Sequence, residues 1–209
     1  VEGCIERYGK SPTALFDELG LFNYGGGAYH SVWVDDSDLE IYKKRGVWAV
    51  INAGSNCKLA SGIAPVSKMM DIGINLAIGT DGPASNNALD MFREMYLIAA
   101  TQKINDCDAA STDANAILKA ATIGSAHCMG LDECDVIDEG KTADLIVIDM
   151  HRPNMQPINN ITKNIVYSGS KENVKMTMIN GKILYENGEF INTDIERIYS
   201  EAQAVIDRI

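Results

Sequence analysis

One aspartate in this sequence stands where a carboxylate can act on a bound molecule. Asp81 lies in AIGTDGPASNN (residues 77–87), after the apolar run GINLAI and before a helix-like segment. The small residues around it, Gly79 and Gly82, let backbone or substrate come close to the carboxylate. Such a group can bind a metal ion and take a proton from water held by that ion. A simpler role is also open, because an aspartate before glycine can accept backbone N–H bonds in a turn.

His30 is the second candidate, because it lies near the end of the strand-like segment GAYHSVWV (27–34). Its imidazole could orient an attacking hydroxide or polarise the bond that breaks. It could equally be a hydrogen-bonded, partly buried histidine. His127, in a helix-like segment, and His151, in a linker, lie far from the strand ends, so we expect both to be structural or surface residues.

The segment NAGSNCKLASG (52–62) reads as a third loop at a strand end. Its polar side chains, including Ser55 and Asn56, could hold the shape of the loop or form hydrogen bonds with a substrate. The run GGG at 25–27 is not a phosphate loop, because it precedes a strand, whereas a phosphate-binding loop follows one and opens a helix.

The elements that must position these residues alternate between helix and strand up to about residue 130. Apolar spacing and end signals predict helices over 12–22, 35–46, 64–73, 87–103 and 112–130, and strands over 27–34, 47–52 and 74–79. This order predicts parallel strands with crossover helices, as in a doubly wound sheet or a β/α barrel. In such folds the chemistry lies in loops after the carboxyl ends of the strands, where the three candidate segments occur.

The pattern changes at about residue 138, after which short strands dominate. Strands are expected over 143–150, 164–169 and 174–190, followed by a helix over 194–209. Asn180-Gly181 is a dipeptide typical of a type I′ hairpin turn. We therefore expect two parts, a β/α part over 1–137 that carries Asp81 and a small β-rich segment with a terminal helix over 138–209.

Composition excludes some classes of partner. The 209 residues include 29 acidic and 18 basic side chains, giving a formal net charge of -11, so a nucleic acid or an anionic membrane is not expected as a partner. Five scattered cysteines read as reduced thiols of a cytoplasmic protein. No apolar run reaches the ~18 residues of a membrane span. Because the chain opens at Val1 with a helix-like sequence, we expect it to be a fragment.

Several stretches together resemble the amidohydrolase superfamily, in the branch of 5-methylthioadenosine/S-adenosylhomocysteine deaminases and related chlorohydrolases. These are SNCKLASGIAPV, GINLAIGTDGPASNNALDMFREMYLIAATQK, ATIGSAHCMGL, IDEGKTADLIVID and INGKILYENG, which cover most of the chain. The resemblance implies the carboxyl-terminal part of a (β/α)8 TIM-like barrel, about three strands of it, together with part of a small β-sandwich.

The resemblance also implies roles for individual residues. Asp81 matches the aspartate after the last barrel strand, a metal ligand and proton shuttle, and His30 matches a histidine that orients the hydroxide or the leaving group. Trp33 is expected to line the substrate pocket, although core packing explains it equally well. Ser55 and Asn56 are candidates for substrate binding from their place in the third loop, not from the resemblance. The implied reaction is attack of a metal hydroxide on a ring carbon of an adenine-like heterocycle, with Asp81 relaying the proton to departing ammonia. The implied cofactor is a divalent metal, zinc first, with iron or manganese as alternatives.

The chain departs from the family pattern in the metal site. The family's H-x-H pair, and its later histidine with a glutamate three residues on, have no counterpart, and a catalytic zinc usually has three protein ligands. We therefore expect the remaining ligands outside this chain, and the chain alone to be inactive. Three strands also leave open sheet edges, which predict a second copy or a complementing amino-terminal half as partner. Dechlorination, deamination of a guanine-like base and a non-catalytic scaffold remain as alternatives.

Overall fold

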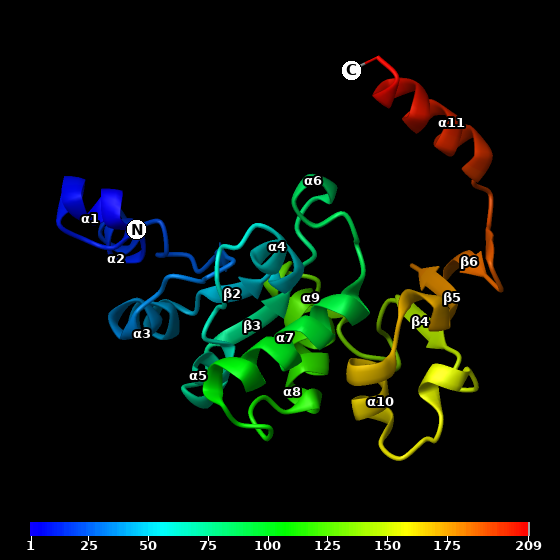
Figure 1. Cartoon of the computed structure of the whole chain (residues 1–209), viewed down its shortest axis with the longest axis horizontal. Coiled ribbons are helices and arrows are strands. Elements are labelled where there is room, and N and C mark those ends of the chain that lie inside the picture. Colours follow the sequence, from blue (N-terminus) through cyan, green and yellow to red (C-terminus); the bar gives the residue numbers. More distant parts are fainter. Residues whose placement is uncertain (209) are drawn as a thin grey trace.

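The structure, a computed structural model, describes residues 1–208 and contains two sheets (Figure 1). The first sheet is parallel, and its strands in spatial order are β1 (Gly27–Tyr29), β2 (Trp48–Ile51) and β3 (Asn75–Ile78). Gly27 lies opposite Trp48, and Trp48 lies opposite Asn75. Parallel strands in chain order, with helices between them, confirm the predicted α/β arrangement of this part.

Helices precede, connect and cover these strands. In chain order they are α1 (Glu2–Tyr8), α2 (Pro12–Glu18), α3 (Asp36–Arg45), α4 (Ala53–Lys58), α5 (Val66–Asp71), α6 (Pro83–Asn86), α7 (Met91–Asp106), α8 (Ala114–Lys119), the π-helical η1 (Ala120–Gly124) and α9 (Ser125–Cys128). Their ends follow ordinary capping rules. Asp35 accepts a hydrogen bond from the Asp38 N–H at the start of α3, and Gly46 ends this helix with a left-handed φ of 66°. The helices predicted over 12–22, 35–46 and 64–73 are confirmed with narrower bounds, and the helix predicted over 87–103 is confirmed but begins and ends later.

Three expectations about the local structure of the α/β part were wrong. The strand predicted over 27–34 ends at Tyr29, because His30 and Ser31 have φ values of 66° and 47°, which no strand accommodates. The segment predicted as a loop over 52–62 contains α4, whose glycine, serine and asparagine residues are more typical of turns. The single helix predicted over 112–130 is divided into α8, η1 and α9.

The π-helical η1 lies against β3 at very short range. A Cβ built on Gly124 would lie 2.3 Å from the backbone oxygen of Leu76, so only glycine allows this approach. The Ser125 hydroxyl lies 3.2 Å from both the N–H and the carbonyl oxygen of Ile78. These contacts bind the end of β3, and thus the loop that follows it, to the helical layer.

The second sheet is antiparallel. Its strands, in the order in which they pair, are β4 (Leu145–Ile148), β5 (Val174–Ile179), β6 (Lys182–Glu186) and β7 (Glu189–Phe190). The β5–β6 turn has φ values of 49° at Asn180 and 72° at Gly181, the two positive values that the predicted type I′ turn requires. Three short 3-10 turns, η2 (Asp132–Cys134), η3 (Pro153–Met155) and η4 (Lys171–Asn173), lie before or between these strands, and α11 (Ile195–Ile206) follows them.

The strand predicted over 164–169 is a helix, α10 (Ile161–Ser168). Its β-branched residues favoured a strand, but Asn160 caps a helix that starts earlier by accepting a hydrogen bond from the Lys163 N–H. Val166 is fully buried in the main core, and α10 packs against α7 and α8. This helix therefore joins the antiparallel part of the chain to the α/β part.

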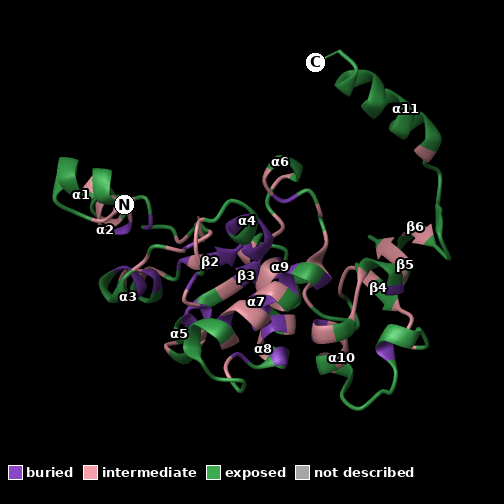
Figure 2. Ribbon diagram, in the orientation of Figure 1, coloured by how far each residue is buried: buried purple, intermediate pink, exposed green. Residues whose placement is uncertain are grey.

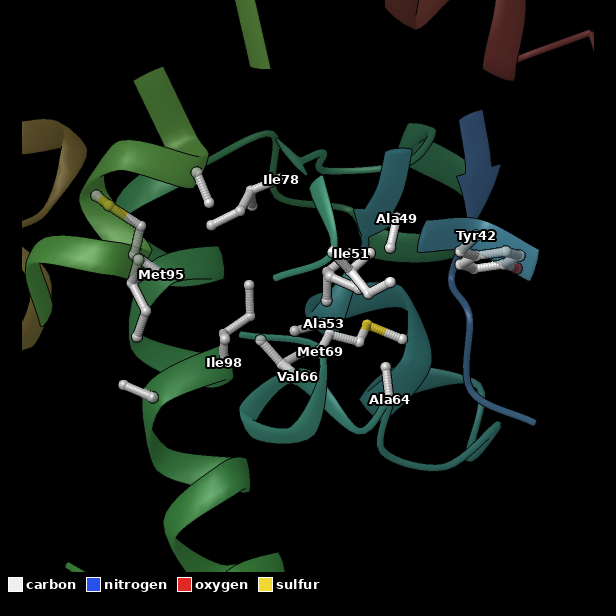
Figure 3. Packing of buried hydrophobic residues seen from close by; sticks show 14 of the residues in the cluster. Tyr42, Ala49, Ile51, Ala53, Ala64, Val66, Met69, Ile78, Met95 and Ile98 are labelled. Carbon is white, nitrogen blue, oxygen red and sulfur yellow. The ribbon is translucent and has the colours of Figure 1, made fainter. Parts of the chain in front are cut away.

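The main core lies around the parallel sheet. Figure 3 shows side chains of β2, α5 and α7 meeting there, with Ile51, Val66, Met69 and Ile98 close together. Burial follows the same division in Figure 2, where buried residues gather around β2 and β3 whereas α11 is exposed from its second residue onward. Among residues 1–208, no helix is both long enough and apolar enough to cross a membrane.

Candidate active site

The candidate residues lie where the three parallel strands end. His30 directly follows β1, Asn52 directly follows β2, and Asp81 comes three residues after β3. His30 and Asp81 both have left-handed backbones, with φ of 66° and 59°. A side chain at such a φ costs free energy, and strain of this kind is common at functional sites. Gly79 is required beside them, because a Cβ there would lie 2.6 Å from Asn52 Oδ1.

Both oxygens of the Asp81 carboxylate accept hydrogen bonds. The Ser55 hydroxyl donates to Oδ2 over 2.6 Å, and the Gly82 N–H donates to Oδ1 over 2.7 Å. The Ser55 hydroxyl contributes most to lowering the pKa of Asp81 to about 2, and the Ser85 hydroxyl and the Gly82 N–H add to this effect. The side chain is still 32% exposed. Asp81 thus presents an ionised carboxylate that is fixed in direction and accessible from outside.

His30 faces this carboxylate through one ring nitrogen. Its Nδ1 lies 2.9 Å from Asn56 Oδ1, and its Nε2 lies 3.9 Å from Asp81 Oδ2. With the amide oxygen of Asn56 as acceptor, Nδ1 carries the proton, which leaves Nε2 of a neutral ring with a lone pair. Asn56 itself is buried, so its contact with His30 fixes both the direction and the tautomer of the ring.

A cavity opens beside the pair. Its volume is about 390 Å³, and its lining includes His30, Ser55, Asp81 and Trp33. Trp33 is 73% exposed, and its indole N–H donates to the carbonyl oxygen of Ser61 over 3.0 Å. An indole fixed in this way presents an exposed aromatic surface at the edge of the cavity, which suits stacking on a flat ring.

The structure thus brings four of the five predicted site residues into direct contact. Asp81, Ser55, His30 and Asn56 form one connected group, and Trp33 joins them only as part of the cavity wall. Direct contact of Ser55, Asn56 or Trp33 with a substrate stays a prediction.

Two buried polar residues beneath the site were not predicted. Glu94, on α7, and Asn86, in α6, are fully buried and bonded to each other. One signal pointed to Glu94, because it lies four residues before Ile98 on a helix face that is apolar except for Glu94 and Gln102. A charged residue at such a position requires an internal partner.

The other histidines lie away from the site. His127 Nε2 lies 2.8 Å from Asp135 Oδ2, and Lys141 Nζ lies 2.7 Å from Asp135 Oδ1. Lys141, followed by His127, lowers the pKa of Asp135 to about 2. His151 is exposed in the turn after β4. These contacts join the chain on either side of η2 and agree with a structural role for His127.

The described residues alone do not complete a metal site. Within 1–208 no three His, Cys, Asp or Glu side chains come close enough together to hold a metal ion, whereas a catalytic zinc usually has three protein ligands and a water. Asp81 has the chemistry of one such ligand, because its carboxylate is ionised and exposed. The residues present therefore fit part of a metal centre.

Comparisons with known proteins agree on one family. A family model described as the amidohydrolase family matches residues 1–184. A 5-methylthioadenosine/S-adenosylhomocysteine deaminase of Caldanaerobacter subterraneus subsp. tengcongensis is 42% identical over 204 residues, which cover 97% of this chain and 47% of that protein. A 5'-deoxyadenosine deaminase of Methanopyrus kandleri is 39% identical over 209 residues, which cover 100% of this chain and 48% of that protein.

A solved structure shows the same likeness in three dimensions. The crystal structure of an adenosine deaminase from Xanthomonas campestris with bound zinc superimposes with a TM-score of 0.94 at 34% sequence identity. The match covers 100% of this chain and 48% of that one. The chain therefore spans about half the length of the relatives that it matches.

Proposed function

The chain belongs to the amidohydrolase family, and on that basis we propose that it forms part of a hydrolase that removes the amino group of an adenine ring. The substrate class is an adenosine with a modified 5' position, such as 5-methylthioadenosine, S-adenosylhomocysteine or 5'-deoxyadenosine. The names of the two relatives at about 40% identity support this choice. We also propose that the parallel sheet, over 1–137, forms part of a β/α barrel and that 138–209 belongs to a small β domain.

The observation that carries the proposal is the arrangement of Asp81. Its carboxylate is ionised, fixed by Ser55 and Gly82, and faces a cavity of about 390 Å³ with His30 Nε2 only 3.9 Å away. A carboxylate whose pKa is about 2 is ionised at neutral pH, so it is available to bind a cation and to accept a proton. We assign Asp81 a second role as one ligand of a divalent ion, zinc in the first place, whose other ligands lie outside this chain.

The reaction adds water across the C–N bond and releases ammonia. A divalent ion in this place would increase the acidity of a coordinated water and so supply the nucleophile. As the new C–O bond forms at the ring carbon, the π bond between that carbon and the neighbouring ring nitrogen opens, and Asp81 accepts one proton of the attacking water. Asp81 then passes that proton to the exocyclic nitrogen, so the C–N bond breaks with ammonia as the leaving group. The second proton of the water moves to the ring nitrogen, which leaves a carbonyl group on the ring carbon. His30 Nε2, with its lone pair, lies where it can accept a hydrogen bond at the same centre, and Trp33 stacks on the ring at the cavity edge.

The test uses the whole protein, in which this chain is joined to the remainder of the barrel. After loading with zinc, ammonia release from the three nucleosides is measured for wild type and for Asp81→Asn. General acid-base catalysis is worth about 10²- to 10⁴-fold, so a loss of at least that size is expected in the variant.

Asp36→Asn serves as the control, because Asp36 lies on the surface at the start of α3. Retained turnover in Asp81→Asn, or no ammonia from any adenosine, contradicts the proposal. A metal-free protein that assembles with a partner but turns over nothing would favour a scaffold.

A further inference from the structure

A fully buried carboxylate lies beneath the candidate site. Glu94 on α7 is 0% exposed, and burial raises its pKa. Its partners are not cations. Oε2 accepts a hydrogen bond from the Gly54 N–H over 2.8 Å, and Oε1 accepts one from Asn86 Nδ2 over 2.7 Å. Burying a carboxylate in this way is costly, so the contacts that it makes call for an explanation beyond packing.

Asn86 extends the network to the loop that carries Asp81. Its Nδ2 also donates to the carbonyl oxygen of Thr80 over 2.7 Å, which uses both amide hydrogens. Its Oδ1 is buried and has no partner among the described residues. The amide cannot rotate to satisfy that oxygen without losing the bonds to Thr80 and Glu94. Its orientation is thus set by the loop and by the carboxylate together.

Gly54 completes the contact. A Cβ at this position would lie 2.3 Å from Glu94 Oε1 and 2.8 Å from both terminal atoms of the Asn86 amide. Only glycine allows the first turn of α4 to lie so close to these two side chains. The segment after β2 and the segment after β3 therefore meet at one buried polar centre.

The chain order connects this centre to Asp81. Gly54 directly precedes Ser55, and Thr80 directly precedes Asp81. The Ser55 hydroxyl in turn donates to Asp81 Oδ2 over 2.6 Å. Ser55 thus follows the Gly54 N–H that donates to Glu94. Asp81 follows the Thr80 carbonyl group that accepts from Asn86.

We propose that Glu94 and Asn86 are positioning residues that fix the direction of the Asp81 carboxylate by holding the backbone on both sides of the Ser55–Asp81 hydrogen bond. This inference rests on the proposed function in one respect, the catalytic use of Asp81. Neither side chain touches the cavity, so both act through Ser55 and Asp81.

The informative variant is Glu94→Gln, which keeps the shape of the side chain. Its amide replaces one acceptor oxygen with a donor, so either the Gly54 or the Asn86 bond is lost. Gln102→Leu is the matched control, because Gln102 is 1% exposed on the same helix and bonds Ala64 and Ser67, before and within the first turn of α5. A general loss of stability should affect both variants, whereas a positioning effect should appear only in Glu94→Gln.

The first measurement needs no activity. In ¹H–¹⁵N NMR spectra of the whole protein, the Gly82 amide reports the position of Asp81, because it donates to Oδ1. We expect the Gly54 and Gly82 signals to move in Glu94→Gln and to stay in place in Gln102→Leu. Asn86→Ser removes the bridge to Thr80 from the other side and should move the Gly82 signal as well, which keeps the test available if Glu94→Gln does not fold.

The second measurement uses the whole protein loaded with zinc. Loss of a supporting contact at such a site costs about 10- to 100-fold, and we expect this loss in kcat, with little change in KM. If wild type releases no ammonia but the Gly82 signal moves, the proposed function fails and the positioning stands. If wild type is active while kcat and the Gly82 signal of Glu94→Gln match those of Gln102→Leu, the inference is overturned and the proposed function stands.

Discussion

The Ser55 hydroxyl and the Asp81 carboxylate are joined by a hydrogen bond of 2.6 Å across the ends of two neighbouring parallel strands. The residues are 26 positions apart in the chain, so only the fold brings them together. This bond also has the largest part in keeping the pKa of Asp81 low. Ser55 therefore both fixes the direction of the Asp81 carboxylate and lowers its pKa.

Ser55→Ala should raise the pKa of Asp81 from about 2 toward the ordinary value of 3.8. Because the folded-state pKa is the lower one, ionised Asp81 stabilises the fold above about pH 4, and this contribution disappears as the pH falls to about 2. In the variant that acid-induced loss should shrink. A ¹³C NMR titration of the Asp81 carboxylate measures the shift directly. Ser61→Ala, in the same cavity wall, should leave the titration unchanged, and an unchanged curve in Ser55→Ala would refute the assignment.

Asn56→Ala should free the ring of His30. In wild type the Asn56 oxygen holds the proton on Nδ1, so removing it should give a mixture of tautomers. The ¹⁵N chemical shifts of the ring nitrogens distinguish the two forms. His127, whose Nε2 faces Asp135, provides an internal control in the same spectrum, because its shifts should not move. A single unchanged tautomer at His30 would show that Asn56 does not control the ring.

Asp135→Asn should change how stability depends on pH. Lys141 and His127 lower the pKa of Asp135 to about 2, so its contribution is present above about pH 4 and is lost as the pH falls toward 2. Urea unfolding at several pH values should show the largest difference between wild type and variant near neutral pH, and almost none near pH 2. The exposed Asp36, paired with Lys68, is the comparison, since an Asp36→Asn change should have little effect at any pH. A difference that does not depend on pH would contradict the role given to this ion pair.

Gly124→Ala should destabilise the α/β part. Its new Cβ would lie 2.3 Å from the Leu76 carbonyl oxygen, so η1 and β3 must separate, at a cost of about 1–3 kcal/mol. Gly3→Ala, in the helix α1 with no atom within 4 Å of the new Cβ, should be neutral or stabilising by up to about 1 kcal/mol. Urea denaturation gives both values. Equal effects from the two substitutions would mean that η1 does not pack on β3 as described.

Much of the α/β part could be predicted from local signals in the sequence. The helical spacing of apolar residues and the capping residues located most of the helices. The alternation of strands and helices placed Asp81 and His30 at one edge of a parallel sheet. The Asn180-Gly181 turn followed from the same kind of local chemistry. These features depend on residues close together in the chain, where the sequence pattern is informative.

The remainder depends on contacts between distant residues. The Gly54 N–H finds its acceptor on Glu94, 40 positions later, and no local pattern indicates that pairing. The β-branched residues of α10 predicted a strand. The segment is a helix because its burial against α7 outweighs that local preference. The short helix α4 was missed for the same reason, since its turn-like residues are held by α6 and α7.

The left-handed backbone at His30, Ser31 and Asp81 has a consequence for laboratory evolution. Glycine at such a position relieves backbone strain of about 1 kcal/mol, whereas the hydrogen bonds of the His30, Ser31 and Asp81 side chains oppose the replacement. The same replacements would erase the side chains that face the cavity. A library with glycine at each residue of positive φ, sorted by loss of turnover, would therefore separate the positions where only the backbone matters from those whose side chains the proposed reaction uses.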